Sequence, residues 1–157
     1  MLYQQKPCAF SQIAEIRSIR DQKARLSERE RELTKPMLTD LDMIPTLYDW
    51  FKEIISQKET FRANVSQRKK FMFIILILYS PGALADGKMK RGLRDKLAEI
   101  FGINGKSTIS DNLNGLYLSY QLYKYFRQDI HRIYNEIMNR MDDSLQLTIF
   151  TTTEPLS

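Results

Sequence analysis

Cysteine and histidine are scarce in this chain of 157 residues. It has one cysteine, Cys8, and one histidine, His131. A single cysteine cannot form an intrachain disulfide, and one histidine without a cysteine cluster does not provide the ligands of a zinc site. A catalytic triad would need His131 on a helix together with Cys8 or a serine that no motif identifies. The sequence therefore predicts a protein that is not an enzyme, with no catalytic residues, no metal and no cofactor.

The chain also lacks a long apolar segment. Its longest apolar run covers residues 71–79, whereas a helix that spans a bilayer needs about 20 such residues. Residues 1–7 lack the basic start, apolar block and cleavage site of a secretory signal. We therefore expect a cytoplasmic protein without a membrane partner, in which residues 71–79 form a helix buried on all sides or, as the alternative, a buried strand.

Hydrophobic residues make up 43% of the chain and charged residues 27%, which is ordinary for a folded globule. The length suits one domain. Lysine and arginine total 24 against 19 acidic residues, which gives a net charge of +5 and a pI near 9.3. This excess favours a polyanionic partner only where it is concentrated locally, so its distribution along the chain matters more than its sum.

Residues 11–35 are predicted to form one exposed helix. Apolar residues are thinly spread along it, while basic and acidic residues interleave, as is typical of a solvated face. Ile19, Leu26 and Leu33 follow one another at a spacing of seven, which would suit a short coiled-coil seam between subunits. Residues 1–35 are thus expected to be a charged N-terminal helix, either solvated throughout or used as an arm for homo-oligomerisation.

Residues 36–141 are predicted to form a helical core. Pro45 suits the first turn of a helix with one apolar face, and Ser66 is the expected N-cap of the helix that contains residues 71–79. From residue 116 to residue 141, apolar side chains recur at steps of three or four. This recurrence predicts one long helix that packs against the rest of the core.

Residues 142–157 are expected to be a tail or a strand. Residues 144–153 alternate apolar side chains with polar ones that favour strands. A strand needs a partner, and residues 1–3 of the same or another chain are one candidate; a tail that orders on binding is the alternative. The predicted fold class is all-α, a compact helical domain with a long C-terminal packing helix and a short C-terminal strand as an open alternative.

The centre of the chain, residues 91–114, resembles a helix-turn-helix. Ala98 and Gly102 have the spacing at which helix-turn-helix proteins place a small residue between two helices and a glycine in the turn. Ile103 follows as a buried turn residue, and residues 108–110, Thr-Ile-Ser, resemble the start of many recognition helices, with Leu113 as the next inward position. The resemblance implies that the second helix enters the major groove of double-stranded DNA.

This segment departs from the common pattern in two ways. Gly105 and Lys106 lengthen the turn by one residue, and Asp111 places a negative charge on the predicted DNA-facing surface. Side chains expected to grip phosphates are those of Lys88, Lys90, Arg91, Arg94 and Lys106, and those expected to meet base edges are Asn104, Ser107, Thr108, Ser110, Asn112 and Asn114. The alternative interpretation is a solvated loop followed by a polar helix N-terminus.

The stretch Tyr-Ser-Pro-Gly-Ala-Leu-Ala-Asp-Gly-Lys at residues 79–88, followed by Arg-Gly-Leu-Arg at 91–94, resembles uncharacterised small proteins of phages and mobile elements. This resemblance covers roughly residues 71–141. We therefore expect a DNA-binding, transcription-regulating protein of a phage or mobile element. The alternative is a helical structural or adaptor protein, or a DNA-packaging component, that self-assembles through its N-terminal helix and C-terminal strand. Burial of residues 108–112 would favour the alternative.

Overall fold

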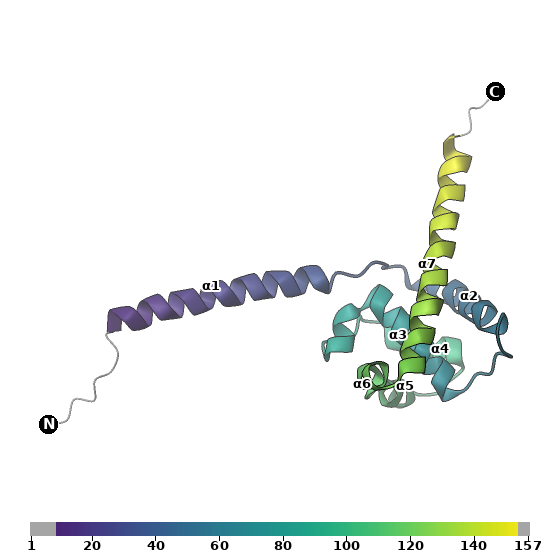
Figure 1. The fold of residues 1–157 in the computed structure, drawn as a ribbon, viewed down its shortest axis with the longest axis horizontal. Helices are drawn as coiled ribbons and strands as arrows, with labels where there is room; N and C mark the ends of the chain where they lie inside the picture. The colour runs from purple at the N-terminus through teal and green to yellow at the C-terminus, as the bar shows by residue number, and fades with distance from the viewer. Residues whose placement is uncertain (1–8, 154–157) are drawn as a thin grey trace. The chain divides into compact units, whose positions relative to one another are not determined.

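The computed structural model describes residues 9–153, with side chains for all of these except Lys106 and residues 147–153. The described part is all-helical, as predicted, and contains no strand (Figure 1). The helices are α1 (Ala9–Leu33), η1 (Leu41–Met43), α2 (Ile44–Ser56), α3 (Val65–Tyr79), η2 (Pro81–Ala85), α4 (Leu93–Phe101), α5 (Lys106–Leu113), α6 (Leu116–Leu122) and α7 (Lys124–Thr153). The chain divides into two units, Met1–Lys35 and Pro36–Ser157.

Helix α1 forms the described part of the first unit and has no buried residue. The predicted exposed helix is therefore confirmed. Exposed ion pairs between neighbouring turns support it, with Arg29 3.1 Å from Glu32 and Arg31 3.2 Å from Glu28. The helix ends at Leu33, after which the hydroxyl of Thr34 donates a hydrogen bond of 2.7 Å to the carbonyl oxygen of Glu30.

Helix α3 is the centre of the second unit, and α2, α5, α6 and α7 all contact it (Figure 1). Ten of its 15 residues are buried, including most of the apolar run at 71–79, so the prediction of a core helix is confirmed. Phe71 packs against Phe51 and Tyr48 of α2, with ring centroids 5.2 and 4.8 Å apart. Among the described residues, no helix is long and apolar enough to cross a membrane.

The N-cap of α3 is Asn64, whereas the sequence pattern had favoured Ser66. The backbone of Asn64 is extended, and its side-chain oxygen accepts a hydrogen bond of 2.9 Å from the backbone N–H of Gln67. Ser66 already lies within the helix, so the sequence correctly indicated a capping residue and misplaced it by two positions.

The segment before η1 is fastened to the C-terminal end of α3. The backbone N–H groups of Met37 and Leu38 both donate to the carbonyl oxygen of Leu78, at 3.0 and 2.9 Å. The hydroxyl of Tyr79 donates to the carbonyl oxygen of Asp40 at 2.7 Å. Carbonyl groups in the last turn of a helix have no partner within it, and the bonds from Met37 and Leu38 satisfy that of Leu78.

The predicted helix at 116–141 is divided in two. Tyr123 lies at one of the steps of three or four from which the inward face was predicted, but its backbone is extended between α6 and α7 and its side chain is 62% exposed. The guanidinium of Arg127 donates to the carbonyl oxygens of Tyr120 and Gln121, which caps α6. This break turns α6 so that Leu116 is buried beside α3, while Ile130 and the later apolar residues of α7 keep their predicted inward positions.

The prediction of a C-terminal strand is wrong for residues 144–153, because these residues are helical and form the end of α7. Each residue added to a helix that already exists gains a hydrogen bond without a new nucleation cost, so side chains that favour strands do not stop it. This part of α7 extends beyond the other helices of the second unit (Figure 1), and its side chains from Asp142 to Gln146 are exposed. The expected partner, residues 1–3, lies outside the described residues.

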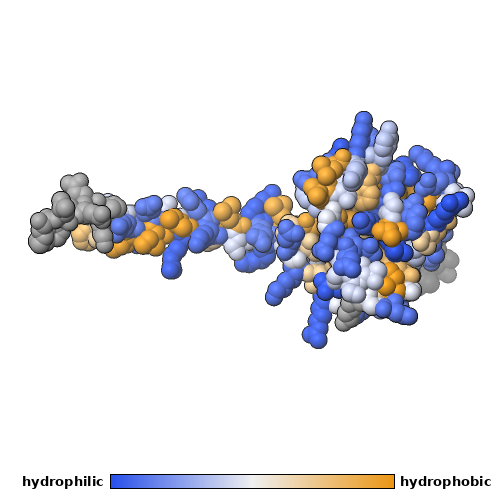
Figure 2. All heavy atoms as spheres, turned by 90° about the horizontal axis from the view of Figure 1, so that it is seen from below, coloured by the Kyte–Doolittle hydropathy of each residue, from blue (hydrophilic) through white to orange (hydrophobic). Residues whose placement is uncertain are grey.

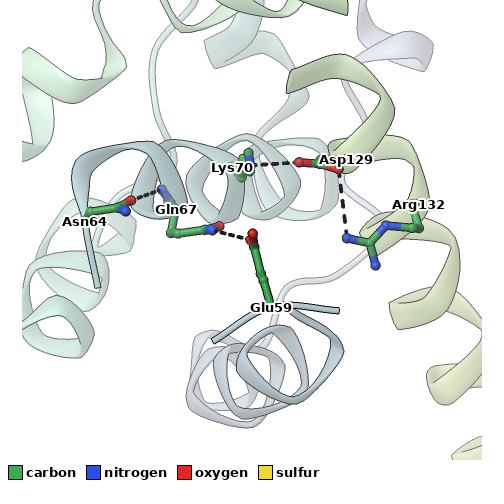
Figure 3. A network of polar contacts seen from close by, with 6 residues as sticks. All are labelled: Glu59, Asn64, Gln67, Lys70, Asp129 and Arg132. Atoms are coloured by element: carbon green, nitrogen blue, oxygen red, sulfur yellow. Dashed lines mark hydrogen bonds and ion pairs between the residues drawn. The ribbon is translucent and has the colours of Figure 1, made fainter. Parts of the chain in front are cut away.

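A polar network joins α7 to the buried helix α3 (Figure 3). The ammonium of Lys70 is 2.9 Å from the carboxylate of Asp129, and Arg132 approaches the same carboxylate at 3.9 Å. The Lys70 side chain is only 11% exposed, whereas that of Asp129 is 40% exposed. The lysine thus depends on its partner more than the aspartate does, because water can solvate the aspartate.

We expect Asp129→Ala to destabilise the protein by about 2 kcal/mol, since it leaves a buried ammonium unpaired. Lys70→Met, which leaves a half-exposed carboxylate still close to Arg132, should cost less than about 1 kcal/mol. Urea denaturation measures both. The control is Asp49→Ala, which removes an exposed ion pair with Lys52 and should cost less than about 0.5 kcal/mol. Equal losses for the two network variants would contradict this account.

Tyr79 couples stability to alkaline pH. Its burial raises the pKa of the phenol to about 12, and the nearby carboxylate of Asp40 acts in the same direction. Between pH 10 and 12 the unfolded chain loses this proton while the folded chain keeps it, so its contribution to stability is complete below pH 10 and is lost as the pH rises.

Tyr79→Phe should therefore destabilise the protein by about 1 kcal/mol at pH 7 through loss of the hydrogen bond to Asp40, and by less as the pH approaches 12. Denaturation midpoints of both proteins across this range measure the convergence. Tyr125→Phe is the control, because Tyr125 is 82% exposed and should show no such effect. A constant difference between Tyr79→Phe and the unmodified protein at every pH would refute the coupling.

Candidate nucleic-acid interface

Helices α4 and α5 pack against each other, and α5 also packs on α3. Leu93 and Leu97 of α4 and Ile109 of α5 are fully buried, and Ala98 is 9% exposed. Helix α4 begins at Leu93 and not at Arg91, because Gly92 adopts the left-handed conformation, with φ of 87°, and starts the helix. The two helices that the helix-turn-helix pattern requires are thus present.

The turn after α4 is a Schellman motif. Gly102 adopts the left-handed conformation, with φ of 66°, and its N–H donates to the carbonyl oxygen of Glu99 at 3.2 Å. The N–H of Ile103 donates to the carbonyl oxygen of Ala98 at 2.9 Å. Ile103 is half-buried against the core. The spacing of Ala98, Gly102 and Ile103 therefore has a structural purpose, which is to cap α4.

Helix α5 has a buried face and an exposed face. Among the predicted base-contacting residues, Ser107 and Thr108 are exposed on the helix, and Asn104 and Asn114 are exposed just before and after it. Ser110 lies at the edge between the two faces, and Asp111 is exposed. Asn112 is 8% exposed, and its amide nitrogen has no hydrogen-bond partner in the described part of the chain, so it lies on the wrong face to meet a base.

Three of the predicted phosphate-binding residues are on the surface. Lys88, Arg91 and Arg94 are exposed, and none of them forms an ion pair with a described residue. Lys90 instead holds the protein's own backbone, because its ammonium donates to the carbonyl oxygen of Thr39 at 2.6 Å and lies 5.7 Å from the centre of the Tyr79 ring. The side chain of Lys106 lies outside the described residues.

A cavity of about 430 Å³ brings several of these residues together. Predicted residues Arg94, Ser110 and Asn114 line it, with Asp86 and Gln121, which sequence reasoning missed, also at its wall. Asp86 is the one described residue other than glycine with a positive φ, 63°, and the Asp-Gly pair it forms with Gly87 was a usable turn signal. Gln121 had no such signal, because the prediction of one continuous helix hid the break after α6.

No family model, curated protein or solved structure matches this chain. Within residues 9–153, no cluster of three or more histidine, cysteine or acidic side chains could hold a metal ion. What the hairpin presents to solvent is a polar helix face with nearby cations, which is suited to hydrogen bonding and to charge attraction.

Gly102→Ala should destabilise the protein by about 1 kcal/mol, because a β-carbon is strained at this positive φ. A β-carbon would meet no atom within 4 Å, so the loss would come from backbone strain and not from a clash. Gly102→Asn is the matched variant and should lose less, since asparagine tolerates the left-handed conformation better. Thermal denaturation tests this order, which a larger loss for asparagine would contradict.

Proposed function

We propose that this protein binds double-stranded DNA through the α4–α5 hairpin, with the exposed face of α5 in the major groove. The observation that carries the proposal is the position of Ser107 and Thr108, exposed at the start of α5, close in the chain to Arg94 of α4 and to Arg91 just before α4, which are also exposed. A recognition helix contacts bases with its first residues, while cations around it hold the phosphates.

Each group in this surface has a chemical role in the proposal. Lys88, Arg91 and Arg94 attract phosphate oxygens, which supplies orientation and affinity that does not depend on sequence. The hydroxyls of Ser107 and Thr108 donate or accept at base edges, and the carboxylate of Asp111 accepts from the amino group of cytosine. Lys90 and Asn112 are not part of the proposed interface. The ammonium of Lys90 is bound to the carbonyl oxygen of Thr39, and the side chain of Asn112 is buried.

The biological role that suits such a protein is regulation of transcription in the cytoplasm by binding without chemistry. The sequence resemblance to small proteins of phages and mobile elements supports this setting, and the Schellman turn supports a rigid hairpin. A fixed angle between the two helices is what a recognition helix needs, because it must enter the groove in one orientation.

A helical structural or adaptor protein is the second candidate. Two observations favour it: Ile109 and Asn112 of α5 are buried, and the surface near α6 exposes large apolar side chains. The exposed residues are Tyr117, Leu118, Leu122, Tyr123 and Tyr125. Tyrosine-rich apolar patches are common at protein interfaces. Thr108 and Asp111 remain exposed, however, so residues 108–112 are only partly buried. We therefore favour DNA binding over the structural role.

Binding to duplex DNA over a salt series, followed by fluorescence anisotropy, tests the proposal. Replacing Lys88, Arg91 and Arg94 together by alanine should weaken binding and reduce the slope of log K against log salt by up to about 3, since each phosphate contact contributes roughly 0.9. Lys90 stays unchanged in this variant because its loss would disturb the segment it holds.

The matched control replaces three exposed cations from other parts of the second unit, Lys58, Arg62 and Lys124. It removes the same charge, so a local interface predicts that its salt slope stays near that of the unmodified protein. Equal weakening in both triple variants would mean that overall charge alone attracts the DNA. Absence of binding at low salt would exclude this function and leave the structural candidate.

A further inference from the structure

Helix α1 carries a set of large apolar side chains that no described residue of its own unit covers. All of its residues are exposed, among them Phe10, Ile13, Ile16, Ile19, Leu26 and Leu33, which are 43–81% exposed. Figure 2 shows apolar side chains among the hydrophilic ones along this helix. Burial of such side chains is the main favourable term in protein association, so a helix that carries six of them gains from a partner.

Four of these residues form one stripe. Ile16 and Ile19 are three positions apart, and Leu26 and Leu33 follow Ile19 at steps of seven. They occupy core positions of a coiled-coil repeat, in which Lys23 and Glu30 take the two remaining core places. The stripe is thus apolar at four of six successive core positions, and its two charged members restrict how it can pair.

We propose that α1 pairs with α1 of a second copy of this chain and that the two helices run antiparallel. In a parallel pair, each charged core residue would face its own equivalent, Lys23 against Lys23 and Glu30 against Glu30, and like charges would repel. In an antiparallel pair centred near Asp21, Ile16 faces Leu26 of the second copy, and Ile19 faces the aliphatic stem of Lys23.

The charges outside the stripe favour the same orientation. An antiparallel pair centred near Asp21 places Glu15 of each helix beside Arg29 of the second copy, which brings opposite charges together twice, against one approach of like charges where Arg20 meets Arg20. Opposed helix dipoles also attract. The acidic residues interleaved along α1 make a polyanion a poor occupant of this surface.

Light scattering coupled to size exclusion of the full chain tests the pairing. We expect a dimer at about 100 µM that dissociates on dilution, and a rise of at least about 100-fold in the dimer Kd for Ile19→Asp with Leu26→Asp, because two apolar core positions become charged. The matched control, Ser18→Asp with Ala24→Asp, places the same charges on the outer face of α1 and should remain a dimer. Circular dichroism verifies that each variant is folded.

Cysteine cross-linking of the full chain, with Cys8→Ser as background, tests the orientation. A mixture of Ile16→Cys and Leu26→Cys chains should form mixed disulfides, while neither variant alone should cross-link, since its two cysteines would lie about 15 Å apart along the axis. Cross-linking of Leu26→Cys alone would show parallel helices and overturn the proposal. A monomer at about 100 µM, or a dimer unaffected by the charged stripe variant, would also overturn it. None of these three results depends on DNA binding.

Discussion

Enclosure of α3 is the constraint on which the second unit depends. Its apolar run at residues 71–79 must be kept from water on every side, and no single neighbouring helix can achieve that. Helix α2 contributes Phe51, α5 contributes Ile109 and α7 contributes Ile133, all of them buried. The position of each surrounding helix follows from the side of α3 that it covers.

The same constraint decides what α5 can present to a partner. Once Ile109 packs inward, the positions three residues later turn inward as well, and Asn112 becomes buried with an amide nitrogen that lacks a partner among the described residues. Ser107, Thr108 and Asp111 then point outward. The proposed interface is therefore the part of α5 that the core does not use.

Polar contacts satisfy hydrogen-bonding groups at the two ends of α3, whereas apolar contacts enclose its middle. Asn64 satisfies an N–H group at the start, and the backbone of Met37 and Leu38 satisfies a carbonyl at the end. Lys90 joins the same end region through the carbonyl of Thr39. Helix α1 has no such tertiary contact with the described residues of its own unit, and its apolar stripe is the reason to expect that it associates with a second copy.

Much of the fold was predictable from the sequence because it depends on local patterns. Apolar periodicity predicted helices, glycine at 102 predicted the end of α4, and nine apolar residues in succession predicted a buried helix. Residue type alone also identified the candidate cations and polar side chains. Which of them reach the surface was not predictable, because Lys90 and Asn112 have side chains as polar as those of their neighbours.

Tertiary structure decided the remaining features through contacts between residues far apart in the chain. The ammonium of Lys90 donates to the carbonyl oxygen of Thr39, 51 positions away in the chain, and is therefore not available to the predicted interface. Helices α6 and α7 both contact α3 on either side of the break at Tyr123, and the helical course of α7 overrides the strand pattern at 144–153. The sequence by itself determined which side chains were available. The enclosure of α3 determined which face of each helix remained free, because that choice depends on neighbours that no local pattern specifies.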